Sequence, residues 1–560
     1  MRVRVPLGIS DFPTLREQRA YYVDKTAFIV RLLDQPTQAV LFARPRRFGK
    51  TLNLSTLRTF LEVSEVDRSA LFEDLAVWTS AEARRHFQRY PVIHLTFKDV
   101  KARSWKEMFA AIRNVIAAEV RRHRELLRSD VLAPEDVESL RRVMREEHAA
   151  VPYHAMLRDL SACLAAHHGR KVVILIDEYD IPIQTAYAEG YYEEAVLFFR
   201  NFLSGGLKDN PHLFKGVLTG VLRVAKESIF SGLNNVDVQS LLSAAYATDF
   251  GFTQAEVDRL VQDMGQPAVA GELRSWYDGY RFAGHTIYNP WSVMKYVASR
   301  EDGFRPHWVF TGSDDVLRNL VLDKGLAMTR ELDALLRGES ITRAVSEHIV
   351  LGEIDTNPDA VWSLLLMSGY LTARSVDLEE AEIHAALAIP NRELAYVFRT
   401  NIKSWVQQAL GGSQHAVESL SKALLTGDAE TFEDLLSDLV LRTVSQHDLA
   451  GGEPERVYQA FLLGMLVHLS GQWDVRSNRE SGHGRYDIAI VPTQPGRPGV
   501  VLELKKLRSH RHETADQALA SAIQQIRERR YEEELVSAGA NPIHVYGVVF
   551  DGKRVRVRAG

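Results

Sequence analysis

The sequence predicts an α/β protein built from three parts, and three patterns along the chain carry this prediction. Short apolar runs alternate with helical patterns through the first half, which is typical of a parallel sheet buried between helices. From about residue 251 the chain changes to amphipathic stretches that predict a mostly helical region. After about residue 430 a long apolar helix, a hairpin, another helix and closing strands follow. We therefore expect an α/β domain at residues 1–250, a helical middle region at 251–430 and a compact α/β domain at 431–560.

Composition and charge restrict the class of protein. The 560 residues are 46% hydrophobic, enough for three or four domains of roughly 100–200 residues. The single cysteine, Cys163, excludes an internal disulfide and a cysteine-based zinc site made by one chain, and it favours a reducing, cytoplasmic setting. No stretch approaches ~18 uncharged apolar residues and the N-terminus lacks the apolar block of a signal peptide, so we expect neither secretion nor a membrane span. With a formal net charge of −5, contact with nucleic acid must come from local basic surface.

Four apolar runs predict the strands of the first domain. They are QAVLFA (38–43), PVIHLTF (91–97), KVVILIDE (171–178) and FKGVLTG (214–220). Apolar runs of this length are typical of strands buried on both faces of a parallel sheet. Polar motifs begin at or just after the ends of the first, third and fourth runs.

The second half of the segment RPRRFGKT, from Arg44 to Thr51, fits the pattern of a phosphate-binding loop. In such a loop, between a strand and a helix, backbone N–H groups wrap the phosphates, a lysine reaches the outer ones and the next hydroxyl holds Mg²⁺. Gly49, Lys50 and Thr51 occupy these three positions, with helix LNLSTLRTFLE behind them. Arg44 stands where the pattern has its first glycine, which removes some backbone freedom at the start of the loop. The alternative is a basic loop that caps a helix.

Acidic residues at the end of the third run favour nucleotide binding over that alternative. VVILIDEYD contains Asp177 and Glu178, an arrangement in which the first carboxylate binds Mg²⁺ through water and the second orients the attacking water. An acidic helix cap would explain the pair alone but not both motifs together. Thr219 ends the next run, where ATPases of the additive (ASCE) class place a residue that senses the γ-phosphate. The residues expected to hold ATP and Mg²⁺ are Arg46, Arg47, Phe48, Gly49, Lys50, Thr51, Asp177, Thr219 and Arg223.

Six motifs together resemble one protein family. RPRRFGKT, LIDEYD, LTGVLRVAKESIFSGLNN, WYDGY, YNPWS and LLLMSGYLT look like the bacterial and archaeal AAA-ATPase-like proteins fused to a PD-(D/E)XK nuclease, in which an arginine usually replaces the first glycine of the loop. The resemblance covers nearly the whole chain and implies an ASCE/AAA-like P-loop NTPase fold. It implies that Lys50 and Thr51 hold phosphate and Mg²⁺. Asp177 would bind the metal and Glu178 would be the hydrolytic base. For Arg223 it leaves a γ-phosphate contact, a charge offered to a neighbouring subunit, and a solvated arginine.

A second motif, GRYDIAIVPTQPGRPGVVLELKKL, predicts an antiparallel hairpin with TQPGRPG as its turn. Glu503 and Lys505 are two residues apart and therefore share one face of their strand. Asp487 lies almost opposite Glu503 if the turn centres near Pro495, and a later centre would offset them. A metal-dependent phosphodiesterase needs carboxylates on Mg²⁺ and a lysine beside the attacking water, which this triad supplies. The alternative is a hairpin with a charged solvent face.

The order of elements around the hairpin resembles the PD-(D/E)XK nuclease core, a restriction-endonuclease-like α/β fold. In that resemblance Glu455, at the start of the preceding helix, is a further metal-side carboxylate, although acidic residues are also favoured in a first helical turn by the helix dipole. Gln525 and Tyr531 look like the family's late glutamine and tyrosine. Glu480 is close enough in sequence to contribute.

Basic residues gather around this module and predict a nucleic-acid partner. They are Lys505, Lys506, Arg508 and Arg511 after the hairpin, and Arg554, Arg556 and Arg558 on one side of the last strand. Phosphate contacts give affinity without reading sequence, so we expect DNA, with RNA as the alternative. A charged edge strand protected from aggregation is the other interpretation. His510 and His512 lack cysteine partners and are interpreted as surface residues.

Together the motifs predict an ATP-dependent, Mg²⁺-dependent nuclease in which the N-terminal ATPase controls a C-terminal DNA-cutting module. The resemblance implies a homo-oligomer, because ATPases of this type commonly act between subunits, and a role in mobile-element biology or defence against foreign DNA. One rival is a nucleotide-gated switch that binds DNA or a protein through an inactive nuclease-like module. Another is a small-molecule P-loop phosphotransferase, which leaves the C-terminal motif unexplained.

Overall fold

The computed structural model forms two compact units, each described by itself. Described are residues 4–146, 151–223, 235–308, 329–349, 351–354, 357–380, 382–409, 414–443, 462, 466, 469, 473–477, 480–481, 484–507 and 513–560. The first unit comprises Met1–Leu317 and Ser340–Leu394, and the second Arg318–Glu339 and Ala395–Gly560. None of the described helices is long and apolar enough to cross a lipid bilayer.

A parallel sheet forms the centre of the first unit, as the apolar runs predict. Its strands are β1 (Ala39–Ala43), β2 (Val92–Thr96), β3 (Val172–Asp177), β4 (Leu213–Gly220) and β5 (Val236–Gln239). In the described part of the sheet their order is β2-β3-β4-β1-β5, and every pairing is parallel. All residues of β1 and β3 are buried. Because β4 lies between β1 and β3, the polar residues at the ends of these three strands meet at one edge of the sheet.

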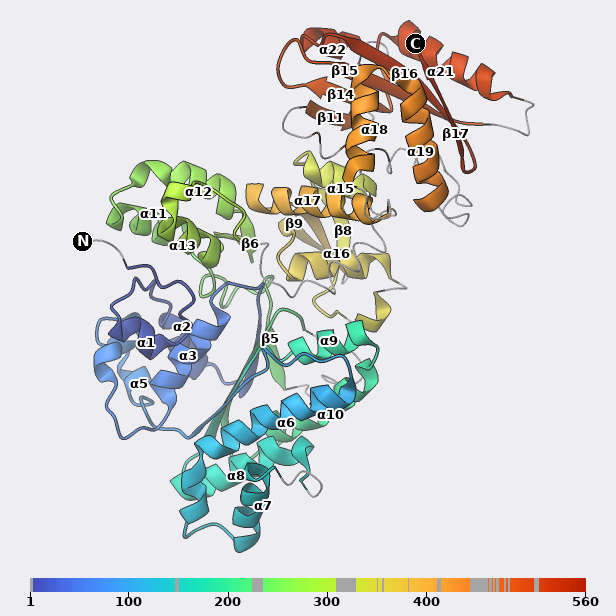
Figure 1. Ribbon diagram of the computed structural model, residues 1–560. Coiled ribbons are helices and arrows are strands. Elements are labelled where there is room, and N and C mark those ends of the chain that lie inside the picture. The colour runs from blue at the N-terminus through green and yellow to red at the C-terminus, as the bar shows by residue number, and fades with distance from the viewer. Residues whose placement is uncertain are drawn as a thin grey trace. The chain divides into compact units, whose positions relative to one another are not determined.

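Helices flank this sheet on two sides (Figure 1). On one side lie α1 (Phe12–Glu17), α2 (Ala27–Asp34), α3 (Lys50–Leu61) and α5 (Ala81–Arg84), and on the other α6 (Trp105–Arg122), α8 (Met156–His168) and α10 (Tyr192–Leu207). The short helix α9 (Ile181–Glu189) follows β3. The arrangement is the α/β layering that the first 250 residues predict.

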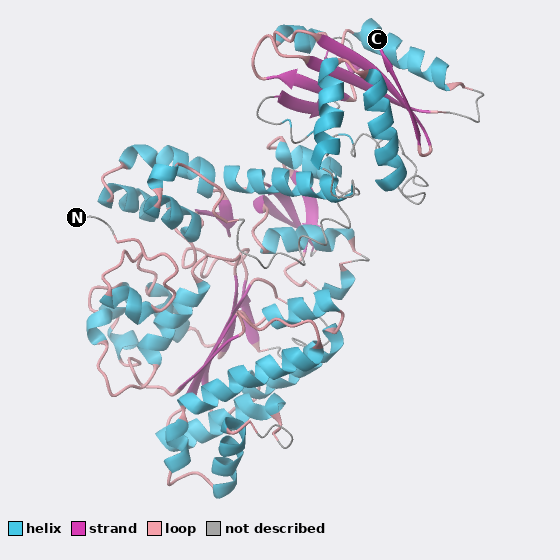
Figure 2. Cartoon of the chain, viewed as in Figure 1, coloured by secondary structure: helices cyan, strands magenta, loops and turns pink. Residues whose placement is uncertain are grey.

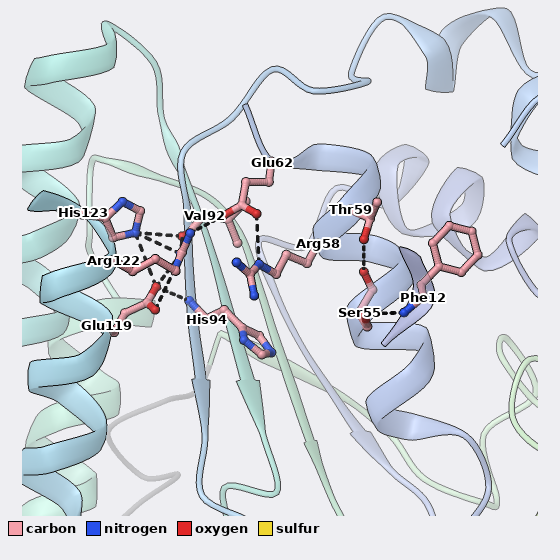
Figure 3. A network of polar contacts seen from close by, with 10 residues as sticks. All are labelled: Phe12, Ser55, Arg58, Thr59, Glu62, Val92, His94, Glu119, Arg122 and His123. Atoms are coloured by element: carbon pink, nitrogen blue, oxygen red, sulfur yellow. Dashed lines mark hydrogen bonds and ion pairs between the residues drawn. The ribbon is translucent and has the colours of Figure 1, made fainter. Parts of the chain in front are cut away.

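A polar network fastens the C-terminal end of α3 to β2 and α6 (Figure 3). Arg122 donates to Glu62, the residue after α3, and also to Glu119 and to the carbonyl of Val92. Glu119 accepts from the backbone N–H of His94 at 2.7 Å. Burial acts against the charge of Glu119, but hydrogen bonds from Arg122 and His123 win and lower its pKa to about 2. The network thus fixes the helix whose other end carries the GKT motif.

The rest of the first unit is mostly helical, with small antiparallel sheets added. Its helices include α11 (Gln254–Asp263), α12 (Ala270–Tyr277), α13 (Pro290–Ala298) and α16 (Pro358–Met367), and its strands are β6 (Tyr280–Phe282), β7 (His285–Ile287), β8 (Ile341–Val345), β9 (Thr372–Glu379) and β10 (Glu382–Ala388). The strands pair as β6-β7 and β8-β10-β9. In the aromatic segment from Trp276 to Trp291, Tyr277, Tyr280, Phe282 and Tyr288 are buried.

The second unit has a mixed sheet with helices on both faces (Figure 2). Its strands are β11 (Trp473–Ser477), β14 (Ile488–Pro492), β15 (Gly499–Lys506), β16 (Ile543–Asp551) and β17 (Arg554–Ala559), in that order across the described sheet. Only the β15–β16 pairing is parallel among these strands. Helices α18 (Gln414–Thr426) and α19 (Ala429–Thr443) pack on the face of Ile488 and Leu502. Helix α21 (Ala515–Arg529) packs on the face of Ala489 and Val501.

Candidate functional site

The loop between β1 and α3 has the backbone geometry of an anion-binding turn. Gly49 is the N-cap of α3 and has φ 85°, a left-handed conformation that glycine adopts without strain. A Cβ at this position would meet nothing within 4 Å, so the glycine is needed for its backbone angle rather than for space. The N-terminal N–H groups of α3 face the loop, and Lys50 next to them is buried. Its Nζ donates to the carbonyls of Arg44 and Pro45, each at 3.0 Å.

Arg44 has a structural task that the sequence analysis missed. Its side chain is fully buried and donates to the carbonyls of Ala43, Gln239 and Tyr246. The guanidinium also lies 5.4 Å from the ring centroids of Phe250 and Phe282. Burial lowers the pKa of Arg44 to about 9. The arginine in place of the first glycine therefore links the start of the loop, by hydrogen bonds, to the last residue of β5 and to the segment that follows it.

The ends of β3 and β4 bring the predicted catalytic residues together. Thr51 Oγ1 donates to Asp177 Oδ2 at 2.8 Å, and Thr219 Oγ1 donates to the other oxygen of the same carboxylate. The backbone N–H of Glu178 donates to Thr219 Oγ1 at 3.3 Å. The backbone of Glu178 has φ 51°. Burial raises the pKa of Glu178, with Lys50 acting in the opposite direction. Two threonines, an aspartate and a glutamate, contributed by α3, β4 and the end of β3, thus share one small site.

Asp180, the last residue of LIDEYD, supports this site and was not singled out from the sequence. It is fully buried, and its Oδ2 accepts from the backbone N–H groups of Val221 and Leu222, each at 2.9 Å. Gly220 is required beside it, because a Cβ there would lie 2.8 Å from Asp180 Oδ1. The carboxylate therefore holds the chain that leads from β4 to Arg223.

The predicted arginines of the site differ in what they contact. Arg46 lies near enough to Glu178 to act on its pKa. Arg47 has φ 70°, its guanidinium lies 4.3 Å from the ring centroid of Trp291, and it donates to the carbonyl of His307 at 2.8 Å. The Nη1 atom of Arg223 lies 3.3 Å from His348 Nε2. Burial lowers the pKa of Arg223. Nucleotide contact by these three residues stays a prediction.

The donor set of this edge of the sheet fits a nucleoside triphosphate with Mg²⁺. The left-handed turn at Gly49 and the N-terminus of α3 suit phosphate oxygens, and Lys50 adds the charge. Thr51 and Asp177 supply the hard oxygen ligands that Mg²⁺ takes. A cavity of about 280 Å³ adjoins the loop, and Lys50, Thr51 and Glu178 are among its lining residues.

The hairpin of the second unit places the other predicted triad as expected. Ile488 pairs with Leu502, and the same register puts Asp487 opposite Glu503. Asp487 Oδ2 accepts from the backbone N–H of Leu504 at 2.7 Å. Glu503 is 3% exposed, and its Oε2 is buried without a hydrogen-bond partner among the described residues. Burial, then the nearby Asp487, raises the pKa of Glu503 to about 7. A buried, unpartnered carboxylate oxygen beside a second carboxylate fits a divalent cation.

Gln525 joins the parts of this second site. It lies on α21, its Nε2 donates to Glu503 Oε1 and lies 3.3 Å from Tyr531 OH, and its Oε1 accepts from Lys505 Nζ at 2.7 Å. Lys505 Nζ also donates to Glu503 Oε1 at 3.0 Å. Glu455 lies outside the described residues, and Glu480 begins the short strand β12 (Glu480–Ser481). In the described part of the chain no group of three His, Cys, Asp or Glu side chains is arranged to hold a metal.

The basic residues of the last strand are partly engaged by carboxylates. Arg556 pairs with Glu433 at 3.1 Å and Arg558 with Asp516 at 2.5 Å, both on exposed surface. Arg508, His510, Arg511 and His512 lie outside the described residues. Nucleic-acid contact through β17 therefore requires these exposed ion pairs to open or to be shared.

Comparison with known proteins agrees with both predicted domain types. Residues 6–230 match the family of predicted AAA-ATPases, described as AAA-ATPase-like, and residues 453–559 match the PD-(D/E)XK nuclease superfamily. The two matches agree with the fusion of an AAA-ATPase-like domain to a PD-(D/E)XK nuclease superfamily domain that the motifs predict. It is 27% identical over 553 residues to an uncharacterized protein in the vnfD 5′ region of Azotobacter chroococcum mcd 1, an alignment that covers 98% of this chain and 96% of the relative. This likeness includes the middle region, which lies outside both family matches.

Proposed function

We propose that the AAA-ATPase-like domain hydrolyses ATP and that this activity controls Mg²⁺-dependent cleavage of DNA by the PD-(D/E)XK domain. The observation that carries the proposal is that two separate clusters each unite, from different elements, the residue types that their chemistry needs. We propose domain boundaries at residues 1–250, 251–430 and 431–560. A role in mobile-element biology or in defence against foreign DNA rests on the family resemblance alone.

In the first domain the proposed reaction is attack of water on the γ-phosphate. Lys50 would exchange the carbonyls of Arg44 and Pro45 for phosphate oxygens, so that its charge offsets the charge that develops during transfer. Glu178 would orient the water and take its proton, and the raised pKa of its buried carboxyl makes it a stronger base. Thr219 positions Glu178 through the backbone N–H of that residue.

In the second domain the proposed reaction is attack of water on a phosphodiester. Lys505 is held by Gln525 beside Glu503, where its ammonium group can orient the water and stabilise the pentavalent phosphate. Asp487 is fixed by the N–H of Leu504 on the neighbouring strand. Thr51 with Asp177, and Asp487 with Glu503, would hold Mg²⁺, which when bound supplies positive charge against the phosphate oxygens.

Degradation of circular and linear DNA with Mg²⁺, with and without ATP, tests this function. Wild type is compared with Lys50→Ala and Asp487→Asn. Exposed positions give the matched controls, Lys106→Ala on α6 and Asp551→Asn at the end of β16. We expect cleavage that requires ATP, that disappears in Lys50→Ala and Asp487→Asn, and that persists in both controls.

Other outcomes separate the rival functions. Cleavage that ignores Lys50 would mean two independent activities. Nucleotide-dependent DNA binding without cleavage by wild type, in Mg²⁺ or Mn²⁺, would establish a nucleotide-gated switch with an inactive nuclease-like module. Phosphate transfer to a small acceptor, with no phosphate release in its absence, would favour a phosphotransferase.

A further inference from the structure

The cavity beside the phosphate loop continues away from Lys50 into a mainly apolar chamber. Its walls come from residues 6–10, 21–23 and 47–53, from Asp249, Gly251 and Phe252, and from Pro290, Trp291 and Met294. At about 280 Å³ it is close to the lower end of the roughly 300–1,000 Å³ typical of small-molecule pockets. Because Lys50 and Thr51 line the same cavity, the chamber directly adjoins the phosphate loop.

Among the described residues that line this chamber, Asp249 and Tyr22 each have a buried polar atom without a hydrogen-bond partner, and Asp249 is the charged one of the two. Its side chain is only 5% exposed. One carboxylate oxygen, Oδ1, forms an ion pair with Arg31. The other, Oδ2, is buried and has no hydrogen-bond partner among the described residues. A buried acceptor in this state is costly unless a ligand supplies a donor.

The position of Asp249 is fixed relative to the phosphate loop by neighbouring contacts. Asn53, on the first turn of α3, donates from Nδ2 to the backbone carbonyl of Asp249 at 2.9 Å. The N–H of Gly251 donates to the carbonyl of Phe48 at 3.1 Å. Burial raises the pKa of Asp249, and Arg31 and Lys25 act in the opposite direction. The carboxylate is therefore a fixed acceptor within reach of whatever occupies the chamber.

We propose that this chamber is the nucleoside pocket of the ATPase and that Asp249 Oδ2 accepts a hydrogen bond from an O–H or N–H group of the bound nucleoside. The inference rests on the proposed ATP binding and adds its specificity. Adenosine offers two kinds of donor, the ribose hydroxyls and the exocyclic amine of the base. A site built around a buried acceptor discriminates strongly against an analogue that lacks the donor, because the acceptor is then left unpaired.

Substitution by asparagine reverses the polarity at the free oxygen. Arg31 donates to Oδ1, so the amide oxygen of Asp249→Asn takes that position and its NH₂ group replaces Oδ2. The variant thus presents a donor where the wild type presents an acceptor. Asp74→Asn is the matched control, since Asp74 also pairs with an arginine, Arg16, but lies outside the cavity.

The test is equilibrium binding to the full chain of ATP, 2′-deoxy-ATP, 3′-deoxy-ATP, the triphosphate of purine riboside, which lacks the amine, and inorganic tripolyphosphate. We expect wild type to bind one of the three analogues at least about tenfold more weakly than ATP, and that analogue identifies the donor. In Asp249→Asn we expect ATP to weaken to the level of that analogue. Tripolyphosphate affinity is expected to stay unchanged, which shows an intact phosphate loop, and Asp74→Asn is expected to bind like wild type.

Three results would overturn the inference and leave the proposed ATPase intact. If wild type binds all three analogues as tightly as ATP, no residue of the chamber recognises a donor group of the nucleoside. This result needs no variant. Asp249→Asn that keeps the wild-type discrimination assigns the reading to another residue. Loss of tripolyphosphate binding together with ATP in Asp249→Asn makes the residue a support of the loop. Failure of wild type to bind any nucleotide would remove the proposed ATPase itself along with the inference.

Discussion

Lys50 and Glu178 occupy a buried site in which each moderates the charge of the other. Burial lowers the pKa of Lys50, and the carboxylates of Glu178, Asp180 and Asp177 oppose that effect. Burial raises the pKa of Glu178, and Lys50 opposes it. A phosphate that enters the site meets a lysine whose carboxylate neighbours favour its charged form, and a glutamate whose basicity is increased.

Glu393 is another buried carboxyl of the first unit. It is fully buried and accepts from Ser292 Oγ at 2.8 Å and from the backbone N–H of Trp308 at 2.8 Å. Burial raises its pKa from 4.5 to about 7, with these hydrogen bonds acting against the rise. The carboxyl is therefore protonated in the folded chain at pH values where it is ionised in the unfolded chain.

Glu393 makes the folded state less stable as pH rises. The stability present below pH 4.5 is lost between about 4.5 and about 7, because the unfolded chain gives up its proton first. Glu393→Gln carries no such proton, so the stability of wild type relative to this variant should fall by on the order of 1–3 kcal/mol across that window. Urea unfolding of both proteins at several pH values, followed by tryptophan fluorescence, measures the difference. The exposed Glu301→Gln is the control, and a pH-independent difference between wild type and Glu393→Gln would contradict the expectation.

At the scale of elements, the phosphate loop is braced from both directions. Arg44 ties its start to the chain after β5, through the carbonyls of Gln239 and Tyr246. At the far end of α3, the helix that follows the loop, Arg122 links the residue after the helix to β2 and α6. The loop itself is short and exposes its N–H groups to a ligand, so its shape depends on these flanking contacts.

Restoring the glycine of the common phosphate-loop pattern should therefore damage this protein. Arg44→Gly removes a buried side chain and its hydrogen bonds to three carbonyls, so we expect a loss of ~2–4 kcal/mol in the free energy of unfolding. Arg44→Lys should also destabilise, because a lysine lacks the planar fork that reaches three acceptors. Chemical denaturation measures both, with Arg46→Gly, a less buried arginine of the same loop, as control. An equal effect of the two glycine substitutions would contradict this role of Arg44.

At the scale of the whole molecule, the two catalytic clusters lie in different compact units. Each cluster is completed by the sheet and helices of its own unit. Basal ATP hydrolysis is therefore expected to be independent of the nuclease carboxylates, while control of cleavage passes from the ATPase to the nuclease.

Asp487→Asn should separate the two proposed activities. It should abolish DNA cleavage and leave basal phosphate release from ATP within about twofold of wild type, because substitutions at independent sites act additively. Phosphate release and DNA degradation measured on the same preparation check this expectation. A parallel fall of both activities would show that the nuclease site supports the ATPase.

Motifs whose chemistry is local could be predicted from the sequence. Gly49, Lys50 and Thr51 are consecutive, and Glu503 and Lys505 share a strand face by their spacing, so backbone periodicity alone puts them together. The register of the hairpin was predictable up to the centre of its turn, and the structure places Asp487 opposite Glu503. The parallel sheet was predictable because strands buried on both faces must be apolar throughout.

By itself, then, the sequence determined the two domain types, the order of their motifs and the residues adjacent along the chain. Only the tertiary structure revealed the partners of Arg44, Arg47 and Asp249. Arg44 donates to Gln239, Arg47 donates to His307, and Asp249 pairs with Arg31, and each pair is separated by roughly 200 residues or more along the chain. Such contacts arise from packing distributed over many side chains, and a local pattern carries no signal for them. The nucleoside chamber is of this kind, since its walls come from segments far apart in the sequence.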